Sequence, residues 1–453
     1  MDSSGPGGQQ TADIPTFGIP SLEAQTTGNL LVLLPEQAVP EGAAEVQQAT
    51  EIELISSADF PGGAVEAAQL QEANGVVFDQ LGVALVRAEP GQVRELAAAV
   101  MDEDRPVLAV EEERVVHALA EPAPGAMTGA FPPPGDYLRG YRDAVNHLVS
   151  SLAPNAGAAL TAAAVDESKM TWGLQHTGAV TSQFSGQGVR VAVLDTGATP
   201  DHPDFLGRKM ELQSFIAGEE AQDGHGHGTH CIGTACGPRN PDQLEQLPAY
   251  GIAFAAEIYA GKVLSNAGSG TGGSILAGIN WAVTNGCRVA SMSLGAPVQP
   301  GQTFSAVFEQ AAQRAMAAGT LIIAAAGNDS RRSEGIVKPV SHPANCPSIM
   351  SVAALDVELQ AANFSNGTVN PAGGQVDIGG PGVRVHSSWP MPTRYRFANG
   401  TSMATPHVAG IAALYAQANP QVTAGELFGL LMRNARRLPL SSIDAGSGLV
   451  QAP

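Results

Sequence analysis

Basic and aromatic residues are scarce in this chain of 453 residues. Lys and Arg together number 23 against 43 Asp and Glu, and aromatic side chains make up 5% of the residues. Twenty of the acidic residues but only four of the basic ones fall in residues 1–119. This acidic balance argues against a nucleic-acid partner, and its concentration in one segment marks that segment as a separate unit. The simpler alternative is that the charge serves solubility alone.

Cysteines and long apolar runs are lacking too. Four cysteines do not make a disulfide framework in a chain of this length, and no Cys-x-x-Cys pair suggests zinc, so we expect reduced thiols. No apolar run approaches the roughly 18 residues needed to cross a bilayer. The first residues show no basic region followed by an apolar one, as a signal peptide requires. We therefore expect no membrane partner and synthesis in the cytoplasm without a signal peptide, with any export by a non-standard route.

The N-terminal third of the chain divides into two predicted segments. Residues 1–28 are rich in Gly, Ser, Gln, Thr and Pro, and this composition predicts a disordered N-terminus. Residues 29–119 combine predicted strands with a helix at 90–100 and a closing strand at 107–119. They are expected to form a small α+β module. A ferredoxin-like module of unrelated function would show the same pattern, so this segment alone leaves its role open.

The remainder is predicted to be a linker and one large α/β domain. Residues 120–165 are rich in Pro and Ala and contain one helical pattern at 136–152. Residues 166–453 alternate helical stretches with apolar strands, and this order is typical of a parallel sheet covered on both faces. The predicted strands are 189–194, 257–263, 289–294, 321–326 and 349–353. In such folds the chemistry lies beyond the carboxyl ends of the strands.

Two of the candidate functional residues follow the first part of this sheet. Asp195 ends the first strand, although an Asp in that place is more often a turn former. Then come His225, His227 and His230 at the start of a helical run. A metal site is the alternative for these histidines. A metal-binding helix would, however, place His at i and i+4 beside an acid, whereas here glycines separate the histidines and allow a substrate to approach closely.

The other two candidates lie further along the chain. Asn328 follows a buried strand, and its amide can donate a hydrogen bond to an oxyanion. Ser402 begins a helix within the stretch 399–410, where small neighbours leave room for a substrate backbone. A serine before an apolar run is most often only an N-cap. The four residues together favour a nucleophile served by a base, an orienting carboxylate and an oxyanion donor.

Together these stretches resemble the subtilisin-like serine peptidases, and their motifs are most similar to those of proteinase K. The resemblance runs from Trp172 to Ala452 in the order Asp, His, Ser. It implies an endopeptidase that works through an acyl-enzyme, with Asp195, His227 and Ser402 as the catalytic triad. It also implies Asn328 as the oxyanion donor and no cofactor for catalysis. Two alternatives remain: a catalytically silent scaffold, and an acyl transferase that makes peptide rings.

The resemblance also implies where an extended polypeptide substrate binds. The peptide would lie between two strands and be held through its backbone, which predicts broad specificity with an apolar residue before the scissile bond. The implied substrate-binding residues are Ser269, Gly270, Ser293, Leu294, Gly295, Ala326, Gly327 and Ser341.

A structural Ca²⁺ site is a further implication of the resemblance. Backbone oxygens of Ala344, Pro347 and Ile349 with the carboxylate of Asp377 would form a hard oxygen site. A second site known in the family is doubtful here. Its Asp204 is present, but the loop 237–249 departs from the pattern.

The resemblance gives residues 29–119 a role as the enzyme's own propeptide, with chaperone and inhibitory functions. It predicts a monomeric zymogen that cleaves itself after Leu119, where the leucine would fill the apolar pocket. One departure from the family is that about 46 extra residues, 120–165, precede the expected start of the mature enzyme. A second cut within 156–165 would remove them. Cys231, four residues after His227, is expected beside the base or simply in the core.

Overall fold

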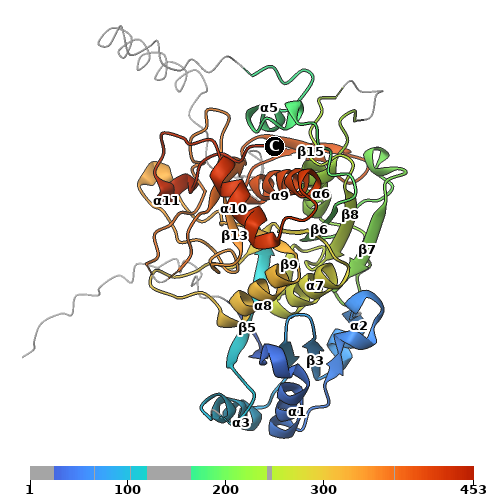
Figure 1. Ribbon diagram of the computed structural model, residues 1–453, viewed down its shortest axis with the longest axis vertical. Coiled ribbons are helices and arrows are strands. Elements are labelled where there is room, and N and C mark those ends of the chain that lie inside the picture. The colour runs from blue at the N-terminus through green and yellow to red at the C-terminus, as the bar shows by residue number, and fades with distance from the viewer. Residues whose placement is uncertain (1–24, 66, 103, 120–164, 242–246, 372) are drawn as a thin grey trace, which may run out of the picture.

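The computed structural model describes residues 25–65, 67–102, 104–119, 165–241, 247–371 and 373–453 (Figure 1). The helix predicted at 136–152 lies outside these residues, as does the linker except its last residue. Among the described helices, none combines the length and the apolar character needed to cross a membrane.

The N-terminal unit, blue to cyan in Figure 1, is an α+β domain. Its strands are β1 (Thr26–Leu33), β2 (Ile55–Ser56), β3 (Gly75–Phe78), β4 (Val83–Val86) and β5 (Ala109–Ala118). Its helices are α1 (Val39–Thr50), α2 (Ala67–Glu72) and α3 (Pro90–Val100). The strands run in the spatial order β5-β1-β4-β3-β2, antiparallel except for the β2–β3 pair. The helix predicted at 90–100 is confirmed, whereas the sequence reading did not foresee α1.

The prediction that residues 1–28 are disordered is wrong at its C-terminal end. Strand β1 begins at Thr26, which pairs with Arg114 of β5. The Thr27 hydroxyl donates a hydrogen bond to the Glu113 carboxylate, as does the Asn29 side-chain amide at 2.8 Å. Pairing with a strand almost ninety residues away thus orders a segment whose composition alone favours disorder. Residues 1–24 lie outside the described part of the chain.

The large domain is built on a seven-stranded parallel sheet in the order β14-β13-β12-β10-β6-β8-β7. Its strands are β6 (Arg190–Asp195), β7 (Met210–Ser214), β8 (Glu257–Lys262), β10 (Val289–Met292), β12 (Leu321–Ala325), β13 (Met350–Leu355) and β14 (Ile378–Pro381). Short strands β9 (Ser269–Thr271) and β11 (Leu294–Gly295) and the antiparallel pair β15 (Val385–Ser388) and β16 (Tyr395–Ala398) lie outside it. The parallel α/β sheet predicted from five apolar runs is therefore confirmed.

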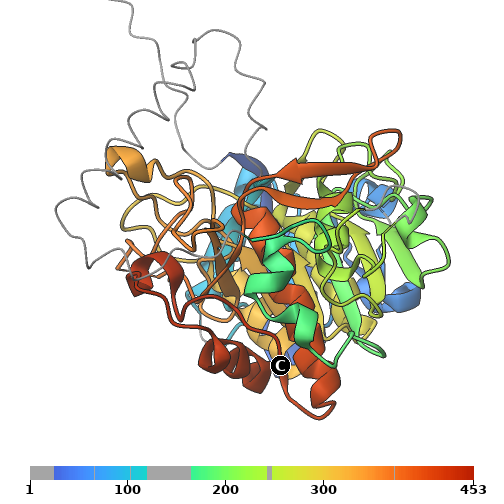
Figure 2. The same ribbon diagram turned by 90° about the horizontal axis from the view of Figure 1, so that it is seen from above.

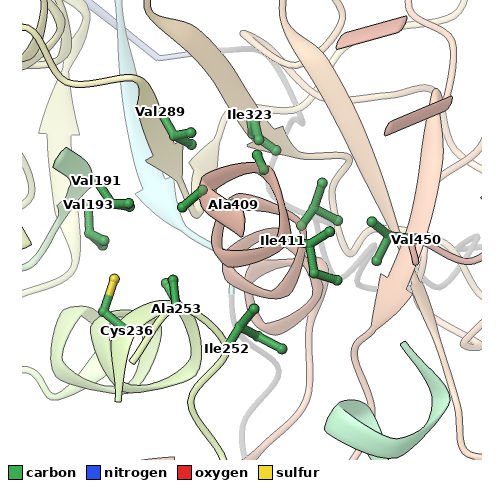
Figure 3. Close-up of a cluster of buried hydrophobic side chains, with 14 of the residues drawn as sticks. Val191, Val193, Cys236, Ile252, Ala253, Val289, Ile323, Ala409, Ile411 and Val450 are labelled. Atoms are coloured by element: carbon green, nitrogen blue, oxygen red, sulfur yellow. The ribbon is translucent and has the colours of Figure 1, made fainter. Parts of the chain in front are cut away.

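Helices cover both faces of this sheet. They are α5 (Trp172–His176), α6 (His227–Cys236), α7 (Gly272–Thr284), α8 (Ala306–Ala317), α9 (Thr401–Ala418), α10 (Ala424–Asn434) and α11 (Ser442–Ala445). Helix α9 is buried from Thr401 to Ala416. Figure 3 shows its Ala409 and Ile411 packed between the sheet, through Val289 and Ile323, and the region of α6. An apolar helix that is buried all round is a rigid support for the residues at its N-terminus.

Side chains alternate between the two faces of β1, so one face packs within the N-terminal domain and the other joins a hydrophobic core shared with the large domain. Leu30 and Val32 face α1 and α3 within the N-terminal domain. Leu31 and Leu33 point to the opposite face of the sheet and join a cluster with residues of α7 and α8, including Phe308. The N-terminal sheet therefore rests on these two helices, and its last strand, β5, continues toward β9 (Figure 1).

Candidate active site

Asp195 and His227 meet where β6 ends and α6 begins. The Nδ1 atom of His227 lies 2.7 Å from Oδ1 of Asp195, and the Thr196 N–H donates to the same oxygen at 2.7 Å. Both side chains are almost fully buried. Burial, the largest single influence, disfavours the imidazolium, but the Asp195 carboxylate and the Cys231 side chain together outweigh it and hold the pKa of His227 well above its usual value. The pair can therefore accept a proton on the imidazole and stabilise the resulting cation.

Asp223, which the sequence reading passed over, fixes the start of α6. Its Oδ1 accepts hydrogen bonds from the Gly226 N–H at 2.7 Å and the Thr196 hydroxyl at 2.9 Å. Its Oδ2 accepts from the Thr229 N–H at 2.8 Å. The carboxylate thus satisfies free N–H groups at the helix start and ties them to the residue after Asp195. The sequence signal that could have identified Asp223 is an acidic residue just before a helical run.

The other two histidines of this stretch have different surroundings. His230 lies inside α6, where burial lowers its pKa to about 3, and its Nε2 lies 3.1 Å from the Val385 carbonyl oxygen. The centroid of the His225 ring lies 6.1 Å from that of His227 at the edge of the site. In the described residues, the one cluster of potential metal ligands is Asp195, His227 and Cys231. The alternative of a metal site built from the three histidines therefore finds no support in the geometry.

Ser402 lies at the second position of α9, directly beside this pair. Gly400 precedes the helix with a φ of 152°, a conformation that L side chains rarely adopt. The Ser402 hydroxyl donates to the Ser293 carbonyl at 3.0 Å. Among the described residues no group hydrogen-bonds the His227 Nε2 atom. The serine and the histidine are thus in the same buried centre, but the hydrogen bond between them is not formed in this structure.

Pro406 explains how the backbone of Ser402 is held. A proline has no N–H, so the carbonyl four residues earlier in the helix, that of Ser402, loses its usual partner. Two side chains replace it: the Ser293 hydroxyl at 2.8 Å and the Cys231 thiol at 3.6 Å. The same thiol lies 3.9 Å from His227 Nδ1. Cys231 therefore lies against the site, and it bridges the helix of His227 to the backbone of Ser402.

Asn328 points its amide into the centre from the loop after β12. Its Nδ2 donates to the Leu119 carbonyl oxygen at 2.7 Å. Its Oδ1 accepts from both the N–H and the hydroxyl of Thr401 at 2.9 Å, which fixes the orientation of the amide. A Cβ at Gly400 would lie 2.7 Å from the same Leu119 oxygen. A peptide carbonyl thus occupies the place next to Ser402 where an oxyanion would be stabilised.

Strand β5 lies between β9 and β11 as a bound peptide would. Val116 and His117 pair antiparallel with Gly270 and Ser269 of β9. Ala118 pairs with Leu294 and His117 with Gly295 of β11. The structure therefore brings four of the predicted substrate-binding residues against one extended segment of the chain.

The Leu119 side chain enters the predicted primary pocket. The Leu119 N–H donates to the Ser293 carbonyl at 3.3 Å, and its side chain lies next to Gly295 and Ser341. Gly327 adjoins Ser341, because a Cβ there would meet the Ser341 hydroxyl. Ala326 is buried beneath, and its carbonyl accepts the Ser341 N–H at 2.9 Å. Six of the eight predicted substrate-binding residues thus pair with β5 or lie next to Leu119, and the other two, Ala326 and Gly327, adjoin Ser341.

The predicted cation site has a cavity beside a buried carboxylate. Pro347 and Asp377 both line a cavity of about 360 Å³. Asp377 accepts one hydrogen bond from the Ser351 N–H at 2.8 Å, but burial prevails and raises its pKa to about 7. Ala344 and Ile349 are buried nearby in the chain.

Asp204, the carboxylate of the doubtful second cation site, is held by two tyrosines. Asp204 accepts hydrogen bonds from the hydroxyl groups of Tyr250, at 2.6 Å, and Tyr395, at 3.0 Å. Two phenols thus surround this carboxylate, in agreement with the doubt that the sequence raised.

Comparison with known proteins agrees with this geometry. Residues 186–449 match the family described as "Subtilase family". The chain belongs to that family. Over 285 residues it is 41% identical to subtilisin Savinase from Lederbergia lenta, covering 62% of this chain and 96% of that protein. It is also 41% identical over 285 residues to M-protease from Shouchella clausii (strain KSM-K16), covering 62% of this chain and 68% of that protein. This subtilase is therefore a serine-type endopeptidase that acts on polypeptides. The likeness of its motifs to proteinase K stays a prediction.

Proposed function

We propose that this subtilase hydrolyses peptide bonds with Asp195, His227 and Ser402 as its catalytic triad and Asn328 as the oxyanion donor. The observation that carries this proposal is the Leu119 carbonyl, held by the Asn328 amide at 2.7 Å beside the N-terminus of α9. A carbonyl in that place presents its carbon to Ser402, at the second position of the helix.

The proposed reaction requires one rotation of the Ser402 hydroxyl. It turns from the Ser293 carbonyl toward His227 Nε2, which is free to accept the proton as the serine oxygen attacks the peptide carbonyl. The oxyanion then receives hydrogen bonds from Asn328 Nδ2 and the Ser402 N–H. His227 returns the proton to the leaving amine. In the second half of the reaction, water, deprotonated by His227, attacks the acyl-enzyme, and Ser402 leaves with the proton returned to it. Asp195 keeps the imidazole in the required orientation throughout.

The proposed specificity is broad, with an apolar residue before the scissile bond. Backbone pairing on β9 and β11 does not depend on the side chains of the substrate. The pocket at Gly295 and Ser341 already holds the leucine side chain of residue 119. Leu119 thereby serves as a built-in example of the preferred residue.

We also propose that residues 25–119 are an inhibitory propeptide that the enzyme cleaves after Leu119. Two of its acids support this role because they reach the N-termini of catalytic-domain helices. Glu111 accepts from the Ala306 N–H at the start of α8 at 2.7 Å, and Glu113 accepts from the Gly273 N–H at the start of α7 at 2.7 Å. Carboxylates at helix N-termini are stabilised by free N–H groups and the helix dipole. At least two of the acidic residues of this segment thereby help to bind it to the large domain.

A comparison of three proteins tests both parts. Wild type should label with a fluorophosphonate at Ser402 and separate into two fragments, and Ser402→Ala should remain full length. Ser333→Ala, at an exposed serine, is the matched control and should process like wild type. N-terminal sequencing should find Ala120 at the new end, or a residue near 160–168 if a second cut follows. Mass spectrometry of the products distinguishes hydrolysis, which adds water, from acyl transfer to an amine.

Two results would contradict these proposals. A wild type that is not labelled by a fluorophosphonate and does not cleave a denatured protein would refute the proposed hydrolytic mechanism. An active enzyme that still carries residues 25–119 would refute the assignment of these residues as an inhibitory propeptide.

A structural cation at Asp377 is proposed as well. The residues present fit a hard cation such as Ca²⁺, because in the described part of the chain no basic side chain forms an ion pair with this buried carboxylate, whose pKa burial raises to about 7. Backbone oxygens of Ala344, Pro347 and Ile349 would complete the site. The ion would stabilise the fold and take no part in catalysis.

A further inference from the structure

The pair of strands β15 and β16 lies beside the reacting groups on the His227 side. Ala398, the last residue of β16, is two residues before Gly400, which contacts the Leu119 carbonyl oxygen. The Trp389 ring, in the turn between the strands, covers Gly226, the residue before His227: a Cβ at Gly226 would be 2.3 Å from that ring. In Figure 1 the β15 strand correspondingly lies next to α6. Figure 2 shows the two strands running side by side at the surface.

This pair of strands is basic, in contrast to the rest of the chain. Arg384, Arg394 and Arg396 lie in or beside it, and no Asp or Glu occurs between Asp377 and Glu426. Two of the arginines lie over aromatic rings. The guanidinium carbon of Arg396 is 4.7 Å from the centre of the Trp389 ring, and that of Arg384 is 5.5 Å from the Phe397 ring.

The Arg396 side chain is placed to receive a negative charge. It is exposed, and among the described residues no carboxylate forms an ion pair with it. A guanidinium stacked on an indole is held in one orientation, while the N–H groups on its edge remain available for a carboxylate. The structure therefore presents this cation on the Trp389 ring, which covers Gly226, the residue before His227.

The direction in which the substrate chain runs determines which of its residues lies near Arg396. Residues 115–119 occupy the side of β9 and β11, so the residues before the scissile bond are accounted for. The leaving amine receives its proton from His227 and must pass that side chain. The part of a substrate that follows the scissile bond therefore passes over Gly226 and the Trp389 ring.

We propose that Arg396, stacked on Trp389, forms a subsite for an acidic side chain at the second position after the scissile bond. The enzyme's own sequence matches this proposal, because Leu119 is followed by Ala120 and Glu121. The proposal rests on the proposed function. It extends it by one specificity residue on the leaving-group side.

Quenched-fluorescence peptides of the form His-Ala-Leu-Ala-Xaa-Pro test the subsite, with Xaa as Glu, Gln or Lys and the processed enzyme as catalyst. Wild type should cleave the Glu peptide with a kcat/KM roughly three- to fivefold above that of the Gln peptide, which is the upper part of the range of an exposed charge pair. The Lys peptide should be the poorest. The preference should shrink in about 1 M salt, where screening shortens the reach of the charge to about 3 Å.

Variants attribute this preference to Arg396. In Arg396→Gln the Glu-to-Gln ratio should fall to about one, and in Arg396→Glu the Lys peptide should become the better substrate. Arg396→Lys, which keeps the charge without the planar stack, should give an intermediate ratio. Arg433→Gln removes an exposed arginine of α10 as the matched control and should keep the wild-type ratio.

Three outcomes would overturn the subsite. Equal kcat/KM for the three peptides in wild type would refute the subsite but not the proposed hydrolysis. A Glu preference that persists in Arg396→Gln assigns the effect to another residue and also removes the proposal. A wild type that cleaves none of the peptides and does not react with a fluorophosphonate overturns the proposed function and the subsite together.

Discussion

Replacing Arg314 should loosen the hold of the catalytic domain on residues 25–119. This side chain projects from α8 into the N-terminal domain and is 7% exposed. Its Nη1 donates to the carbonyl oxygens of Leu81 at 2.6 Å and Gly82 at 3.1 Å, and its Nη2 donates to the Leu34 carbonyl at 2.7 Å. One cation thus binds two separate turns of the N-terminal domain through backbone oxygens.

The size of the effect follows from these contacts. A hydrogen bond with one charged partner contributes about 1.5–3 kcal/mol net, and three bonds from one group are not additive. The cost of burying the guanidinium, which also lowers the pKa of Arg314, offsets part of the gain. We therefore expect Arg314→Ala to weaken binding by about 2–4 kcal/mol, which corresponds to a roughly 30- to 1,000-fold higher inhibition constant. Arg314→Lys should fall between, because an ammonium cannot reach both turns at once.

The assay measures inhibition of the processed enzyme by the released fragment. Each enzyme is titrated with a fluorophosphonate first, so that the inhibition constant refers to active sites and a change in turnover does not enter it. Gly82→Ala perturbs the same contact from the N-terminal domain, because its Cβ would lie 1.9 Å from Arg314 Nη1 and its φ is +56°. The two changes combined should weaken binding by less than the sum of their separate effects. An inhibition constant for Arg314→Ala within about threefold of wild type would refute the reasoning.

Three further predictions concern the site and its support. Asn328→Leu should lower kcat by roughly 10²–10³ with little change in KM, because the donor acts on the oxyanion; an unchanged kcat would remove Asn328 from the mechanism. For Asp377, the folded protein binds a proton up to about pH 7, whereas the unfolded chain releases it near pH 4, so stability without a cation should fall by on the order of 4 kcal/mol between those values. Ca²⁺ should therefore raise the thermal midpoint more at pH 8 than at pH 5, and an equal rise in Asp377→Asn would contradict the site. A mercurial should slowly inhibit the wild type, since burial raises the pKa of the Cys231 thiol, and should spare Cys231→Ser but not the control Cys287→Ser.

The parallel sheet was predictable because its strands are short runs of apolar residues with no polar interruption. Within the predicted run 289–294, residues 289–292 form β10 and Leu294 begins the separate strand β11, while most of the run 321–326 forms β12. Strands β10 and β12 are buried on both faces. Strand β1 was harder, because the segment that contains Thr26 looks disordered until Arg114 and Glu113 are folded beside it. Its order comes from contacts distant in sequence, which composition does not report.

The sequence determined the identity and the chain order of Asp195, His227, Asn328 and Ser402, since each follows a strand or begins a helix and carries a side chain suited to its chemistry. It also marked the segment ending at Leu119 as the one that fills the site.

Only the tertiary structure decided how these groups are held and what surrounds them. It turned the Ser402 hydroxyl toward Ser293, placed Cys231 under the carbonyl that Pro406 frees, and brought Arg396 over Trp389 beside Gly226. The physical reason is that hydrogen bonds and stacking depend on distances of a few ångströms between atoms far apart in sequence. Such distances exist only once the sheet and the buried helix α9 have fixed the positions of the loops between them.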